Sequence, residues 1–243
     1  MLVLSLNYLH PTPYAMTMKV TFLGHACFLV EVNKTRLLFD PYISPNPLAK
    51  SVDVDAIQAD YILLSHGHYD HVADVERIYN NHPATIIANL EIINWYAKKG
   101  LTKALPINPG GQRLLDFGTI KAVNEPHASS MPDGSYAGSA LGFVVQRGDK
   151  TFYFAGDTAL HQDMKQLGEF HDIDCAMLPI GDSFTMGIED ALYAAEYVRA
   201  KKIIGMHYDS FPGIEIDHEA VKRIARERGK ILILMDVGQT TEF

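Results

Sequence analysis

The sequence of 243 residues predicts a layered α/β fold, in which two sheets pack face to face and helices cover their outer faces. Two observations favour this fold. Closely spaced runs of β-branched and aromatic residues, joined by short turns, indicate a meander of strands. The meander is followed by alternating helix and strand patterns, and this order occurs twice along the chain. No linker rich in serine, glycine or proline separates the halves, so we expect one domain over residues 18–243.

The first half is expected to begin with a three-stranded meander. Asn33 and Lys34 form the tight turn before its third strand, and Asp40 and Pro41 end that strand. Gly100 closes the second of two expected helices. These helices are expected over residues 72–79 and 90–98. The strands are expected over residues 18–23, 26–32, 36–39, 61–64, 85–88 and 104–107.

The second half is expected to repeat this rhythm. Hairpin turns at residues 116–118 and 148–149 join its first strands in pairs. The helices that follow are expected over residues 160–167, 188–200 and 217–228. The strands are expected over residues 112–115, 120–124, 139–146, 151–154, 175–179, 202–206 and 231–234.

Composition and charge exclude some classes of function. The chain carries 21 basic and 29 acidic residues, a net charge of −8, which argues against binding nucleic acid or an anionic membrane through general electrostatics. No apolar run reaches transmembrane length. Cys27 and Cys175 lie in apolar runs without metal-finger spacing, so we expect reduced core residues and a cytoplasmic protein. The expected partner is a small molecule, and an assembly of identical chains is compatible with the sequence.

The first 17 residues precede the first expected strand. They are expected to form a poorly structured extension, or to precede a true start of translation at Met16 or Met18. A secretory signal is the alternative, but a basic start, a longer apolar centre and a small-residue cleavage site would be needed for it.

A histidine-rich stretch follows the predicted buried strand 61–64. Three histidines and one aspartate occupy the six positions 66–71. Alternate residues of an extended segment point the same way, so His66 and His68 can bind one metal ion together. Asp70 and His71 lie at the mouth of the next helix and can bind a second ion. Imidazole and carboxylate suit zinc, iron or manganese, whereas the alternative is a polar loop with solvated histidines.

Three further candidates share one structural context. His127, Asp157 and His207 each follow a predicted strand, on a loop. Sheet proteins often place ligand-binding residues on such loops at one edge, so a single cluster with the histidine-rich stretch is expected. The alternatives are a loop histidine, a turn aspartate and a strand-end histidine bonded to the backbone.

The order of these motifs resembles the metallo-β-lactamase superfamily. The resemblance rests on S-H-G-H-Y-D-H at 65–71, then His127, G-D-T at 156–158 and M-H-Y at 206–208. Further stretches at 24–26, 156–160, 178–187 and 206–212 are similar to small, uncharacterised metal-dependent hydrolases near ascorbate-6-phosphate lactonase. The resemblance covers residues 18–243. It implies a four-layer αββα sandwich with a binuclear metal site.

The resemblance also implies how the ligands are shared. The first metal is held by His66, His68 and His127, the second by Asp70, His71 and His207, and Asp157 bridges both. Two divalent ions in such sites lie about 3.5–4 Å apart, and they can share a hydroxide that acts as nucleophile. Zinc is expected first, with manganese and iron as alternatives. Asp70 and His207 are the candidate catalytic residues, with Asp70 orienting water and passing a proton to the leaving group.

Candidate substrate contacts rest on weaker patterns. His25 is expected beside the metals as an outer-shell or substrate contact, with a structural role as the alternative. Ser183 and Thr185 precede a helix and can hold a phosphate or carboxylate, although either can equally cap that helix. Tyr208 can donate to an oxyanion or simply pack.

The sequence therefore predicts a dinuclear metal-dependent hydrolase that uses a metal-bridging hydroxide. Its expected substrate is a small anionic ester or lactone of the sugar-phosphate kind, by resemblance to the lactonase branch. One alternative is a phosphodiesterase on a cyclic nucleotide or RNA end, but no basic segment for gripping RNA is present. The other alternative is a binding or sensing module without turnover. The presence of a suitable residue at every expected ligand position argues against it.

Overall fold

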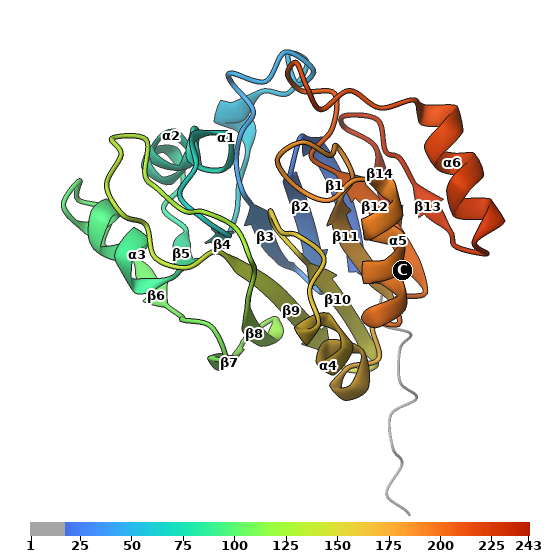
Figure 1. Cartoon of the computed structure of the whole chain (residues 1–243). Coiled ribbons are helices and arrows are strands. Elements are labelled where there is room, and N and C mark those ends of the chain that lie inside the picture. Colours follow the sequence, from blue (N-terminus) through green and yellow to red (C-terminus); the bar gives the residue numbers. More distant parts are fainter. Residues whose placement is uncertain (1–17) are drawn as a thin grey trace, which may run out of the picture.

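The computed structural model describes residues 18–243 and contains two sheets that face each other (Figure 1). The predicted extension over residues 1–17 lies outside the described residues. The first sheet runs in the order β14 (Thr240–Glu242), β1 (Met18–Gly24), β2 (Cys27–Val32), β3 (Thr35–Phe39), β4 (Tyr61–Leu63), β5 (Thr85–Ala88), β6 (Ala104–Pro106). The second runs in the order β13 (Leu232–Ile233), β12 (Lys202–Met206), β11 (Cys175–Pro179), β10 (Lys150–Phe154), β9 (Leu141–Arg147), β8 (Gly118–Asn124), β7 (Gln112–Leu115).

Each sheet changes strand direction in the same way. In the first, β14, β1, β2 and β3 pair antiparallel, and β3 to β6 pair parallel. In the second, β7 to β10 pair antiparallel, and β10 to β13 pair parallel. The predicted meander followed by alternating helices and strands is therefore confirmed in both halves. Parallel strands need crossover connections, and helices supply most of them.

Helices cover the outer faces of both sheets (Figure 1). Those after the first meander are α1 (Tyr69–Val72), α2 (Val75–Asn81) and α3 (Leu90–Ala97), with a short 3-10 turn η1 (Val54–Ala56) before them. Those of the second half are α4 (Asp163–Phe170), α5 (Ile188–Tyr197) and α6 (His218–Glu227). The predicted layered α/β architecture, helices outside and sheets inside, is confirmed.

Strand periodicity divides the apolar side chains between two cores. In β3, Leu37 and Phe39 join the cluster between the sheets, whereas Leu38 joins the cluster under the first helices. The same alternation places Leu63 between the sheets and Ile62 under the helices. Each fully buried side chain of this size contributes roughly 1.5–3 kcal/mol relative to an exposed one. Two packed cores therefore hold the loops at the strand ends in place.

The boundaries differ from the predictions at several places. The helix predicted over residues 72–79 is split into α1 and α2, because Asp74 accepts hydrogen bonds from the amides of Ile43 and Ser44, at 2.7 and 2.8 Å, and so ties this turn to another loop. The helix predicted from residue 160 begins at Asp163. Strand β14 was not predicted, because three mostly exposed residues gain their structure only by pairing with β1.

Two further features concern the length of the helices and the state of the cysteines. Within residues 18–243, no helix has both the length and the apolar character needed to span a membrane. Both cysteines are free and buried, as predicted, and burial raises the pKa of the Cys175 thiol to about 12. They are core residues with little reactivity.

Candidate metal centre

Five strands deliver polar side chains to one region. His25 follows β1, His66 follows β4, His127 follows β8, Asp157 follows β10 and His207 follows β12. These positions come from both sheets, and their side chains lie within contact distance of one another. The ends of the two sheets thus converge on a single cluster.

The first group of donors contains three imidazoles. One nitrogen from each of His66, His68 and His127 lies within 4.8 Å of the others. His66 Nδ1 lies 2.9 Å from the hydroxyl of Ser65, which leaves Nε2 to face the group. His66 Nε2 lies 2.9 Å from His68 Nδ1. A cation placed between these two nitrogens can be bound by both.

The second group mixes imidazoles with one carboxylate. Donor atoms of His25, Asp70, His71 and His207 lie within 4.8 Å of one another. Asp70 Oδ2 is 3.7 Å from both His71 Nε2 and His207 Nε2. The side chains of His71 and His207 are almost fully buried, and that of Asp70 is 25% exposed. Asp70 therefore gives this group its opening to solvent.

Asp157 lies between the two groups. Its Oδ2 atom is 3.8 Å from His66 Nε2 and 3.5 Å from His127 Nε2, both in the first group. The same oxygen is 3.3 Å from His71 Nε2 and 3.1 Å from His207 Nε2, both in the second. A carboxylate in this position can contact two cations at once.

Two glycines allow the loops to approach this closely. A Cβ atom at Gly67, between His66 and His68, would lie 2.6 Å from the side chain of Ala137 and 2.9 Å from the carbonyl of Ser130. Gly156 has a φ of +62° and would place a Cβ atom 2.6 Å from the Ser65 side chain. Larger residues at either position would displace the adjacent histidine or aspartate.

A buried carboxylate orients the second group from behind. Asp40 is fully buried and accepts a hydrogen bond from His71 Nδ1 at 2.8 Å. It also accepts from the amide and hydroxyl of Ser65, at 2.8 and 2.5 Å. With Nδ1 committed to Asp40, Nε2 of His71 faces the centre, an arrangement common around metal-bound imidazoles.

The charges of the cluster compensate one another. Burial raises the pKa of Asp157, but His71 and His207 outweigh this effect and hold it well below its ordinary value. Burial lowers the pKa of His207, but Asp157 and Asp70 outweigh it and raise this pKa to about 9. Burial dominates in the first group and lowers the pKa of His66, His68 and His127. The first group thus holds neutral imidazoles, the form that binds metal. In the second group the carboxylates are ionised and raise the pKa of His71 and His207, so a bound cation would take the place of their protons.

The residues fit a metal centre. His71 Nε2 and Asp157 Oδ1 are buried and have no hydrogen-bond partner among the described residues. The 3.3 Å approach of His71 Nε2 to Asp157 Oδ2 lacks the alignment of a hydrogen bond. Buried donor and acceptor atoms are nearly always satisfied, so unpaired atoms inside a histidine and aspartate cluster indicate ligands of a cation. All seven predicted ligands lie in this cluster.

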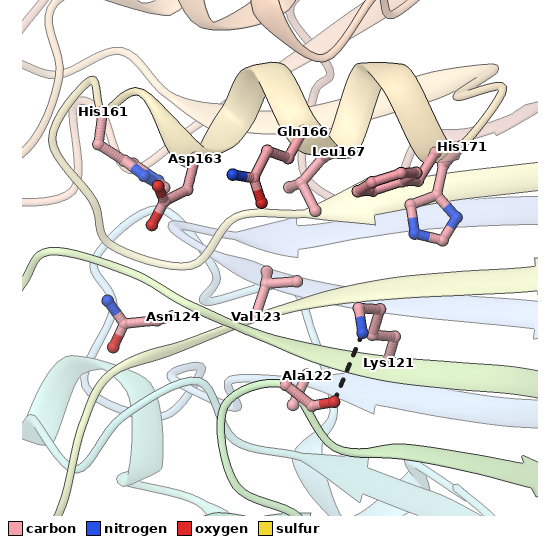
Figure 2. A pocket seen from close by; sticks show the side chains of 11 residues that line it. Lys121, Ala122, Val123, Asn124, His161, Asp163, Gln166, Leu167 and His171 are labelled. Atoms are coloured by element: carbon pink, nitrogen blue, oxygen red, sulfur yellow. Dashed lines mark hydrogen bonds between the residues drawn. The ribbon is translucent and has the colours of Figure 1, made fainter.

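The cluster opens into a small cavity. Its volume is about 240 Å³, and the residues that line it are His68, Asp70, His127, Asp157, Phe184, His207 and Phe211. A separate cavity of about 290 Å³ lies between β8 and α4 (Figure 2). In Figure 2, Val123 and Asn124 lie on the strand and Gln166 and Leu167 on the helix, with none of the clustered donors among the lining residues. Chemistry that uses the donors therefore belongs to the first cavity.

The predicted substrate contacts lie apart from this opening. The Ser183 hydroxyl donates to the carbonyl of Gly213 at 2.8 Å, and the Thr185 hydroxyl lies 3.4 Å from the carbonyl of Met186. Tyr208 is buried against the ring of His218. None of the three predicted residues lines the cavity, so their contact with substrate stays a prediction.

His25 lies behind Asp70. Its side chain is fully buried, its Nε2 atom is 3.1 Å from Asp70 Oδ2, and its Nδ1 atom is 2.6 Å from Ser210 Oγ. Burial lowers the pKa of His25 to about 4, so this imidazole is neutral at physiological pH. The geometry favours the outer-shell role over direct substrate contact, because His25 can fix the orientation of Asp70.

Replacement of His25 with asparagine is expected to weaken the binding of the second metal ion by about 10–100-fold, as is typical for partners of metal ligands. Asparagine tolerates the φ of +58° at this position but is too short to reach Asp70. Titration of metal-free protein with Co²⁺, followed by absorption, separates the two binding steps. His218→Asn, at an exposed histidine paired with Asp209, is the control, and equal affinities in both variants would contradict the role of His25.

The chain is similar to known proteins in both sequence and structure. The profile of a family described as "Beta-lactamase superfamily domain" matches residues 35–208. A UPF0173 metal-dependent hydrolase from Methylacidiphilum infernorum is 48% identical over 206 residues, which cover 85% of this chain and 91% of that protein. The UPF0173 metal-dependent hydrolase YtkL from Bacillus subtilis is 43% identical over 231 residues, which cover 93% of this chain and 100% of that protein.

Among solved structures, Igni18 is described as a novel metallo hydrolase from the hyperthermophilic archaeon Ignicoccus hospitalis. It superposes with a TM-score of 0.85 at 32% identity, covering 93% of this chain and 98% of that one. The range matched by the family profile contains all seven predicted metal ligands, whereas His25 lies before it.

Proposed function

The chain belongs to the beta-lactamase superfamily and is a metal-dependent hydrolase of the UPF0173 group, and from this premise we propose that it hydrolyses a small ester or lactone at a centre of two divalent metal ions. The observation that carries the proposal is the position of Asp157. One carboxylate oxygen lies 3.1–3.8 Å from four imidazole nitrogens that belong to two separate donor groups. A site for a single metal ion would not need a second complete group of donor atoms.

The donor set indicates what the bound ions contribute. When bound, two divalent cations supply Lewis acidity and lower the pKa of a coordinated water from about 15.7 towards 7. Imidazole and carboxylate ligands without thiolate suit zinc, with manganese and iron as alternatives. We propose zinc as the first choice.

The residues of the chain place and orient the reacting groups. Asp40 and His25 hold His71 and Asp70 from behind, so the ligand atoms are fixed before substrate arrives. Asp70 and His207 line the cavity and are the proposed catalytic residues. The neighbouring histidines keep the pKa of Asp70 well below its ordinary value despite burial, so its carboxylate is ionised and can accept a hydrogen bond that orients a water molecule.

The proposed reaction is hydrolysis of an acyl carbon–oxygen bond. A bond forms from the acyl carbon to the oxygen of water, and the bond to the alkoxy oxygen breaks. One proton of the water leaves with the alcohol, and the acid product releases the other to solvent. The cavity of about 240 Å³ is just below the roughly 300–1,000 Å³ typical of ligand pockets, which suits a small substrate.

The alternatives raised by the sequence receive less support. A phosphodiesterase that grips a nucleotide or RNA end needs cationic side chains near the phosphates, and no lysine or arginine lines the cavity among residues 18–243. A non-catalytic binding module does not need a ligand that opens to solvent, as the partly exposed Asp70 does.

The test of the proposed function is activity as a function of metal content. We expect the full chain, stripped of metal by chelator, to lose hydrolysis of esters and lactones and to regain it as zinc is restored to two ions per chain. Zinc content is measured by mass spectrometry on the same samples, and manganese and iron are compared in parallel. Full activity at one ion per chain, or activity that survives metal removal, would contradict the dinuclear proposal.

A further inference from the structure

The cavity over the metal centre is lined by only two kinds of residue. Five are donors of the cluster, and the other two are Phe184 and Phe211. In the described part of the chain, no lysine, arginine or hydroxyl-bearing residue contributes to this lining. Whatever part of a substrate lies outside the metal ligands therefore meets aromatic carbon.

Phe184 is an exposed aromatic residue held at the edge of the cavity. It is 60% exposed and lies on the loop between β11 and α5. The loop around it is tied down, because the Asp182 amide donates to the carbonyl of Met186 at 3.1 Å and the Ser183 hydroxyl donates to Gly213. Single exposed apolar residues are common at protein surfaces, so exposure alone does not make a site.

Phe211 supplies the second, independent observation. Its ring centroid lies 6.1 Å from that of Phe184. The same centroid lies 5.5 Å from the ring centroid of His25 and 6.0 Å from that of His207. The ring of Phe211 is thus packed against His207 and His25, and the ring of Phe184 is exposed beside it. The two rings are tilted at 53°, so they form two walls that a flat or branched apolar group can contact.

The surroundings do not favour an anion at this place. From the sequence, Ser183 and Thr185 on the loop before α5 are candidates to hold a phosphate or carboxylate. Glu189 and Asp190 already occupy the first turn of α5 and complement its N-terminus, and Arg228 is paired with Glu189 at 2.6 Å. Among the described residues no lysine or arginine lines the cavity, so an anionic group beyond the metal ligands would find no cationic side chain of this kind to pair with.

We propose that the substrate carries an uncharged aromatic or branched apolar group, which Phe184 and Phe211 hold while the ester or lactone lies at the metal centre. This inference rests on the proposed function and replaces the anionic sugar phosphate expected from the resemblance. The two phenylalanines are specificity-determining residues in this scheme. Every ester would meet the same metal ligands, so the two aromatic rings would determine which esters bind well.

The test is binding of three hydroxamates to zinc-loaded full-length protein by calorimetry, since hydroxamates bind metal without being turned over. Benzohydroxamate carries an aromatic group, acetohydroxamate a methyl group and succinic monohydroxamate a carboxylate. We expect benzohydroxamate to bind roughly 10-fold more tightly than acetohydroxamate, as one buried aromatic contact allows. The anionic probe should bind no more tightly than acetohydroxamate.

Phe184→Ala should remove the preference for benzohydroxamate over acetohydroxamate. Phe170→Ala is the matched control, because Phe170 is 76% exposed on α4 and lines the other cavity. Equal binding of all three probes, or tightest binding of the anionic one, would overturn the aromatic site while leaving the metal centre intact. Failure of every probe to bind zinc-loaded protein would instead overturn the proposed function and the inference with it.

Discussion

Replacement of Asp157 with asparagine is expected to have the largest effect on activity of any single change, lowering kcat/KM by more than about 100-fold. Mutation of a residue that hydrogen-bonds to a metal ligand typically lowers metal affinity or activity by about 10–100-fold. Mutation of a ligand shared by both metals should lower them further. Asp157 Oδ2 lies between the two donor groups, at 3.3 Å from His71 and 3.5 Å from His127. An amide oxygen carries no charge and cannot replace this carboxylate between two cations.

Metal content and turnover are measured together on the Asp157→Asn protein. We expect fewer than two ions per chain, and thermal unfolding establishes that the variant is folded. Asp116→Asn is the control, because Asp116 pairs with Tyr61 at the start of β4, whereas the centre lies beyond the end of that strand. Two ions per chain with unchanged turnover in Asp157→Asn would refute the bridging role.

Asp40→Asn is expected to have the largest effect on stability. Asp40 is fully buried and holds both His71 and Ser65, so the change removes one partner of a buried ion pair. We expect the free energy of unfolding of the metal-free protein to fall by roughly 3 kcal/mol, the lower end for such a loss. Asparagine tolerates the φ of +39° at this position, so backbone strain does not confuse the result.

The measurement is urea unfolding of metal-free protein, followed by zinc titration of the folded variant. Zinc affinity should fall by about 10–100-fold, because His71 loses the partner that fixes its orientation. Asp60→Asn, at an exposed carboxylate that accepts from the Arg36 amide at 2.7 Å, should change stability by no more than about 0.5 kcal/mol. An Asp40→Asn protein as stable as this control, with native zinc affinity, would show that Asp40 is dispensable.

Much of the fold could be predicted because its signals are local. Strand β11 and strand β12 lie at their predicted residues, 175–179 and 202–206, since each is a short apolar run bounded by polar residues or turns. The break between α1 and α2 could not be predicted, because it depends on Asp74 meeting a loop about 30 residues away in sequence. Strand β14 forms only by pairing with β1 across nearly the whole chain, and no local pattern reports such a contact.

The residues of the candidate site also divide into those that local sequence signals predict and those that only the fold reveals. The ligands on the histidine-rich stretch stand close together in sequence, and the others carry the signal of a polar residue at a strand end. Asp40 carries that signal too, since it follows β3, but a polar residue that only ends a strand gives the same pattern. Phe184 lies between Ser183 and Thr185, which are candidates because of their hydroxyl groups. Only the fold shows that Phe184 is the one of the three that lines the cavity.

The most direct test of the central claim is a crystal structure of zinc-loaded protein with anomalous diffraction data collected at the zinc edge. We expect two anomalous peaks about 3.5–4 Å apart. One should lie within the group of His66, His68 and His127, the other beside Asp70 and His207, with Asp157 between them. A single peak, or two peaks with Asp157 bound to neither, would contradict the dinuclear centre.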